Sequence, residues 1–116
     1  MKIINVKTDS KNYEIKVGDD LLGSIPLKKL VSEKDILLVI DNRVPELLIN
    51  KLKSNLKKSS SKKINSIKIN ALEKNKNMSY LSKVYDFLIR NNYSRDCVIF
   101  GIGGGITCDM TGFIAS

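Results

Sequence analysis

A short apolar run that meets three consecutive glycines constrains the fold of this chain more than any other feature. Residues 98–100 are typical of a strand, the glycines occupy 103–105, and a helix-like segment starts at Ile106. Because glycine loses the most backbone freedom on folding, three in a row mark a positive φ or a close approach to the main chain. Between a strand and a helix N-terminus, such a loop suits a bound phosphate.

The glycine spacing alone leaves two interpretations open. It does not fit the dinucleotide fingerprint, because residue 106 is Ile where that pattern needs glycine, and the Lys-Ser/Thr of a P-loop is missing. The spacing therefore favours a phosphate-binding loop, with a tight turn needed only for packing as the alternative.

The rest of the chain alternates strand and helix patterns. Strands are expected at residues 2–8 and 13–17, as a hairpin around the turn-rich residues 9–12, and at 35–40, 64–69 and 97–100. Helices are expected at 20–30 (short and broken), after Pro45 with a stripe of Leu48, Leu52 and Leu56, after a cap at Ser79, and from 106 to 116. This order predicts an α/β, Rossmann-like fold: a mostly parallel sheet with flanking helices, preceded by a β-hairpin.

Ligands of such sheets bind beyond the carboxyl ends of the strands, where three polar loops converge at residues 41–44, 71–77 and 101–109. Asp41 is either a turn former or a ribose ligand. Glu73 and Lys76 are either an exposed ion pair or ligand contacts. Asp109 either complements the helix dipole or accepts a hydrogen bond from a ribose or nicotinamide group.

Three residues of the last helix are expected to serve packing. Gly112 should let the helix lie close to the sheet, and Phe113 should lie in the core. Cys108 is expected to be a small buried filler, with a reactive thiol as the alternative.

Composition narrows the function classes. The 116 residues contain no histidine, which excludes a His-based catalytic triad and argues against a transition-metal site in this chain. The net charge of +8 comes largely from lysines at 51–63, without the arginines and aromatics that nucleic-acid surfaces use, so we expect a solvated helix end and no nucleic-acid partner. No apolar run is long enough to span a membrane. With two cysteines and no signal sequence, we expect a cytoplasmic chain.

The quoted residues resemble the N-terminal part of the 3-dehydroquinate synthase family along the whole chain. Residues 103–115 are similar to its signature G-G-G-V-x-G-D-x-x-G-F-x-A, and 73–77 to its Gly-Glu-x-x-Lys segment. The hairpin residues 13–18, the strand ending at Asp41 and the Arg95-Asp96 pair also match. The chain departs from the family pattern at Arg43, Leu72, Asn75 and Cys108.

The resemblance implies a phosphate-eliminating lyase that uses NAD and a divalent metal, zinc or cobalt. Its sugar-phosphate substrate is 3-deoxy-D-arabino-heptulosonate 7-phosphate, and its shikimate-pathway product is 3-dehydroquinate. The implied cofactor contacts are Asp41 at the adenosine end, Glu73 and Lys76 around the ribose, Gly104, Gly105, Ile106 and Thr107 at the pyrophosphate, and Asp109 near the nicotinamide ribose.

The resemblance also implies that residues 1–116 are an N-terminal NAD-binding domain without the family's helical metal-binding domain, and inactive alone. It further implies a homodimer for the full-length enzyme. No catalytic or metal-binding residue is expected in this chain. Two alternatives stay open: a non-catalytic remnant or interaction module of the same fold, and a fragment of an NAD-dependent glycerol or iron-type alcohol dehydrogenase, whose family shares the triple glycine and the Asp.

Overall fold

A three-stranded parallel sheet organises the molecule, and the computed structural model describes residues 1–116. The strand order is β4 (Ile64–Ile69), β3 (Ile36–Asp41), β5 (Val98–Ile102), with β3 parallel to both neighbours. All six residues of β3 are buried, as the continuous apolar run predicts for a central strand. The expected Rossmann-like α/β fold is therefore confirmed.

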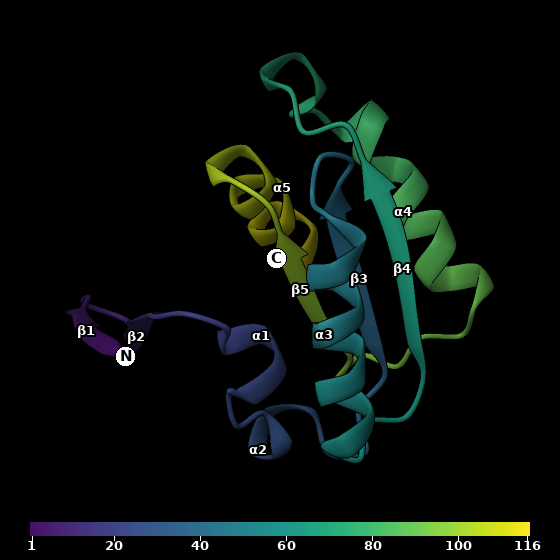
Figure 1. The fold of residues 1–116 in the computed structure, drawn as a ribbon. Helices are drawn as coiled ribbons and strands as arrows, with labels where there is room; N and C mark the ends of the chain where they lie inside the picture. Colours follow the sequence, from purple (N-terminus) through teal and green to yellow (C-terminus); the bar gives the residue numbers. More distant parts are fainter.

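Helices cover both faces of the sheet (Figure 1). The side chains of β3 alternate between the two faces, so Ile36, Leu38 and Ile40 join one core and Leu37 and Val39 join the other. The first core is completed by α2 (Lys28–Val31) and α3 (Glu46–Lys58), and α1 (Leu21–Ser24) packs against α3. The second is completed by α4 (Met78–Arg90) and α5 (Gly105–Ala115).

An antiparallel hairpin of β1 (Lys2–Lys7) and β2 (Asn12–Val17) precedes these layers, as expected. It stands apart from the sheet in Figure 1, and neither core cluster includes any of its residues. Almost all of its side chains are exposed, including the apolar Ile4 and Ile15. The hairpin is thus held by its own ladder of hydrogen bonds and not by a shared core.

The expected broken helix is present as α1 and α2, but two helix details differ from expectation. In α3 the buried stripe is Ile49, Leu52 and Leu56, while Leu48 is 39% exposed. A strict spacing of four drifts around a helix of 3.6 residues per turn, and Ile49 keeps the stripe on the sheet.

In α4 the N-cap is Asn77, whose side chain accepts a hydrogen bond from the Tyr80 N–H. Ser79 already lies in the first turn.

The sheet edges are less buried than the strand patterns predict. Residues of β5 are half-buried or exposed, because this strand pairs on one side only. No helix is both long enough and apolar enough to cross a membrane.

Candidate functional site

The carboxyl edge of the sheet brings the three expected loops together. One shallow cleft there, of about 290 Å³, is lined by Asp41, Arg43, Ala71, Gly104, Gly105, Ile106 and Thr107. These residues come from the ends of β3 and β4 and from the first turn of α5. Four of them are the residues expected at the pyrophosphate, and a fifth is the expected adenosine-end carboxylate.

The glycines of the loop have two different roles. A Cβ on Gly101 would lie 2.2 Å from the Thr111 hydroxyl oxygen, and one on Gly103 would lie 2.4 Å from that of Thr107. Gly103 also has a φ of +156°, where side chains are strained. Nothing lies within 4 Å of a Cβ on Gly104 or Gly105. The first pair therefore lets α5 pack tightly on β5, while the second pair leaves the helix N-terminus open to a ligand.

The start of α5 offers unpaired donors to the cleft. The first backbone N–H groups of a helix have no partner within it, and the helix dipole adds positive potential there. Thr107, in this first turn, is 1% exposed, and its hydroxyl is the buried side-chain polar atom that has no hydrogen-bond partner in the structure. A buried unpaired hydroxyl is costly, so its presence beside open glycines fits an oxygen-rich ligand group.

Asp41 is held at the bottom of the same cleft. It is 7% exposed; its Oδ2 lies 3.0 Å from Arg43 Nε, and its Oδ1 accepts a long bond of 3.4 Å from the Ala71 N–H. The hydrogen bond from Arg43 holds the pKa of the Asp41 carboxyl below its usual value, against the opposing effect of burial. Asp41 is therefore an ionised, anchored carboxylate.

Lys76 connects the second loop to the last helix. Its ammonium lies 3.2 Å from Asp109 Oδ2 and 3.4 Å from Glu73 Oε1. The hydrogen bond from Lys76 to Asp109, followed by the charge of Glu73, raises the pKa of Lys76. Of the two interpretations of Glu73 and Lys76, the ion pair is present, but Lys76 also reaches Asp109, a contact that the sequence spacing does not predict.

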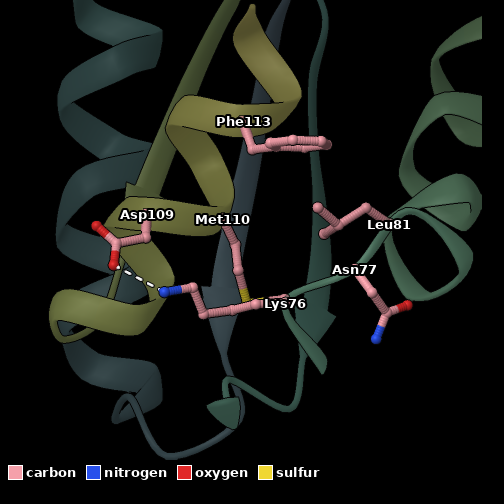
Figure 2. A pocket seen from close by; sticks show the side chains of 6 residues that line it. All are labelled: Lys76, Asn77, Leu81, Asp109, Met110 and Phe113. Carbon is pink, nitrogen blue, oxygen red and sulfur yellow. Dashed lines mark hydrogen bonds and ion pairs between the residues drawn. The ribbon is translucent and has the colours of Figure 1, made fainter. Parts of the chain in front are cut away.

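A second, apolar pocket of about 110 Å³ lies beside this contact, between α4 and α5. It is lined by Lys76, Asn77, Leu81, Asp109, Met110 and Phe113 (Figure 2).

Phe113 is 48% exposed, so the expectation that it lies in the core is wrong. Cys108 is exposed and not a buried filler, and a Cβ on Gly112 would meet nothing within 4 Å. Phe113 lines the open pocket between α4 and α5 and is not enclosed in the core.

The donor set for a metal is not present in this chain. No three His, Cys, Asp or Glu side chains come close enough to hold a metal ion. The resemblance implies a divalent metal in the full-length enzyme but no metal ligand among residues 1–116, and we assign no chemical step to a metal held by this chain.

The fold and the strand-end cleft define a Rossmann-like α/β domain. The chain is similar to the N-terminal part of the 3-dehydroquinate synthase family: the family model described as "3-dehydroquinate synthase N-terminal" matches residues 66–116, and curated relatives match the whole chain.

The chain is 32% identical over its whole length to a 3-dehydroquinate synthase of Ruthia magnifica, covering 32% of that protein. It is 34% identical to one from Clostridium kluyveri, covering 33% of that protein. The chain thus spans about a third of the length of the curated relatives it matches.

Among solved structures, a 2-deoxy-scyllo-inosose synthase superposes with a TM-score of 0.81 at 18% identity, over 98% of this chain and 32% of that one. Another structure of a 2-deoxy-scyllo-inosose synthase, complexed with carbaglucose-6-phosphate, NAD+ and Co2+, matches with the same TM-score. These likenesses establish the fold.

Proposed function

We propose that this chain is the N-terminal NAD-binding domain of a 3-dehydroquinate synthase. The observation that carries the proposal is the convergence of Asp41, Gly104, Gly105 and Thr107 on one cleft. These residues combine an ionised carboxylate with the open N-terminus of a helix, which are the groups that a ribose and a pyrophosphate require.

We assign each end of the cofactor to one part of the carboxyl edge. The pyrophosphate lies at the N-terminus of α5, with the Thr107 hydroxyl as an additional donor. Asp41 takes the adenosine end. Glu73, Lys76 and Asp109 hold the ribose near the nicotinamide, beside the pocket between α4 and α5. Lys76 keeps its proton because two carboxylates stabilise its charge, and so it donates hydrogen bonds at neutral pH.

The activity proposed for the whole enzyme is conversion of 3-deoxy-D-arabino-heptulosonate 7-phosphate into 3-dehydroquinate and phosphate. When bound, NAD+ supplies a temporary hydride acceptor, which acidifies the substrate C–H next to the oxidised carbon. The contribution of this chain is to bind and orient the cofactor. We propose that it has no activity alone, and that the full-length enzyme is a homodimer. A cytoplasmic location is supported by the two free cysteines, Cys97 and Cys108.

Calorimetric titration of the 116-residue chain with NAD+ tests the binding proposal. Saturable heat with a dissociation constant below about 1 mM supports a cofactor domain, because weaker affinities correspond to only about 4 kcal/mol of binding free energy. Absence of heat up to millimolar NAD+ would identify the chain as a non-binding remnant of the fold. A matched variant, Thr107→Val, should weaken binding without changing the shape of the loop.

A further inference from the structure

Arg43 joins the carboxyl ends of β3 and β4 through two hydrogen bonds. Its Nε–H donates to Asp41 Oδ2 at 3.0 Å, and its Nη2 donates to the Ala71 carbonyl oxygen at 3.1 Å. The second bond connects residues that are 28 positions apart in the sequence. Because the guanidinium is a rigid, planar set of donors, the two bonds together fix the Asp41 carboxylate relative to the loop that starts at Ala71.

The other restraints on the Asp41 carboxylate are weak. The Ala71 N–H donates to Oδ1 at 3.4 Å, which is longer than the usual range for such a bond. The rest of the cleft lining has no charged side chain, since it is formed by Gly104, Gly105, Ile106 and Thr107. In the cleft, the charge on Asp41 is therefore balanced by Arg43 and by the positive potential at the N-terminus of α5.

Asp41 keeps acceptor capacity for a ligand while it is held in this way. An ionised carboxylate offers about four lone-pair sites. The bonds from Arg43 and from Ala71 each occupy one site. Because Asp41 lines the cleft, its remaining sites are left for the hydroxyl groups of a ribose.

We propose that Arg43 is a positioning residue for the cofactor: it holds the Asp41 carboxylate and the loop of residues 71–77 in the arrangement that binds the adenosine end. The inference rests on the proposed function, because Asp41 is the residue assigned to that end. The same loop carries Lys76, so the bond from Arg43 to Ala71 also helps to place the ammonium that contacts Asp109.

The effect of Arg43 is expected in binding and not in folding. Its side chain is 65% exposed, and an ion pair this accessible adds little to stability. Replacing Arg43 should therefore leave the chain folded, which makes the binding experiment interpretable.

The pH dependence of NAD+ binding separates this role from a merely structural one. In the parent chain the hydrogen bond from Arg43 keeps the pKa of Asp41 below its usual value. Without Arg43, burial raises that pKa, so protonation begins at a higher pH and removes acceptor sites for the ribose. In calorimetric titrations, Arg43→Met should bind NAD+ about tenfold more weakly than the parent at pH 7, and this ratio should grow toward pH 4.5.

Two further variants serve as comparisons. Arg43→Lys keeps the charge but lacks the planar fork that reaches both oxygens, so it should restore the parent's pH profile and only part of the affinity. Arg90→Met is the matched control, because Arg90 is an exposed arginine at the end of α4 and its loss changes the net charge equally. It should bind NAD+ as the parent does. Circular dichroism checks that each variant is folded.

The Asp41 carboxyl can also be titrated without cofactor, through the NMR shift of its carboxyl carbon. Its pKa should be higher in Arg43→Met than in the parent. An unchanged titration, or an affinity ratio that is near one or the same at both pH values, refutes the role of Arg43 and leaves the NAD-binding proposal standing. If the parent chain does not bind NAD+, the proposed function fails and the positioning role fails with it.

Discussion

The Lys76 ammonium lies 3.2 Å from the Asp109 carboxylate, and so joins the loop after β4 to α5 across 33 residues of sequence. The Lys76 side chain is 33% exposed and that of Asp109 is 64% exposed. An ion pair this accessible contributes little to stability. The role of this ion pair is to orient two polar groups at the mouth of the apolar pocket.

Lys76→Met should therefore affect binding far more than folding. We expect the thermal midpoint at pH 7 to stay essentially unchanged and the NAD+ affinity to fall about tenfold, as for the loss of one charge-assisted hydrogen bond. The raised pKa of Lys76 adds a pH test. Any stability from this contact is present below the ordinary lysine pKa and is lost as the pH rises through the folded-state pKa. Between pH 9 and 12, the thermal midpoint should fall less with rising pH for Lys76→Met than for the parent chain.

The unpaired Thr107 hydroxyl predicts opposite effects on stability and binding. Thr107→Val keeps the side-chain shape and removes a buried polar atom that has no partner, so it should raise the free energy of unfolding by about 1 kcal/mol. It should also weaken NAD+ binding. Thr107→Ser, which keeps the hydroxyl, is the control for binding. A Thr107→Val chain that is less stable, or that binds NAD+ as well as the parent, would contradict the assigned role.

The two pairs of glycines predict a contrast between folding and binding. Gly101→Ala places a methyl group 2.2 Å from the Thr111 hydroxyl oxygen and should cost about 1–3 kcal/mol in urea unfolding. Gly104→Ala meets open space and should leave stability nearly unchanged, while its methyl group hinders the cofactor. Equal stability losses in the two variants would show that the loop packs differently.

The buried stripe of α3 can be checked by two neighbouring substitutions. Ile49→Ala removes a side chain that is 1% exposed and should cost about 2–5 kcal/mol. Leu48→Ala alters a partly exposed position and should cost about 1 kcal/mol or less. If the two variants have the same dependence of unfolding free energy on denaturant concentration, their denaturant midpoints compare the two costs directly.

Asp96 gives a pH test far from the cleft. Its hydrogen bond from Lys34, at 2.8 Å, and a second from Ser94 lower the pKa of the Asp96 carboxyl to about 2. A depressed acid pKa stabilises the fold above the unfolded-state value and loses that effect as the pH falls toward the folded-state value. Stability contributed by Asp96 should therefore decline between pH 4 and 2, and Asp96→Asn should remove this part of the decline. The measurement is the thermal midpoint across that range.

The sequence predicts the fold well where a pattern has one physical solution. The apolar run ending in Asp41 is too short for a buried helix and is typical of a strand covered on both faces, and the glycines after β5 favour a strand-to-helix turn. The sequence predicts helix caps and side-chain burial less well, because these depend on contacts with other parts of the fold. Asn77 and Ser79 are both good capping residues, and only the position of the first turn selects Asn77. Phe113 reads as core in any apolar helix, yet its burial depends on whether another element packs there.

In the candidate site too, some features follow from the sequence pattern and others only from contacts in the fold. Strand order alone places Asp41 and the glycine loop at one edge, because parallel strands end together. The Arg43–Asp41 and Lys76–Asp109 contacts depend on side-chain reach in three dimensions, which residue spacing does not contain.

The separation of the β1–β2 hairpin from both cores means that one melting temperature does not describe this chain. The hairpin opens by breaking its own ladder, without disturbing the packing around β3. Tyr13 reports on the hairpin, whereas Tyr85 packs against the second core. Probes at the two tyrosines should follow separate transitions, and amide exchange in the first 17 residues should measure local opening and not global unfolding.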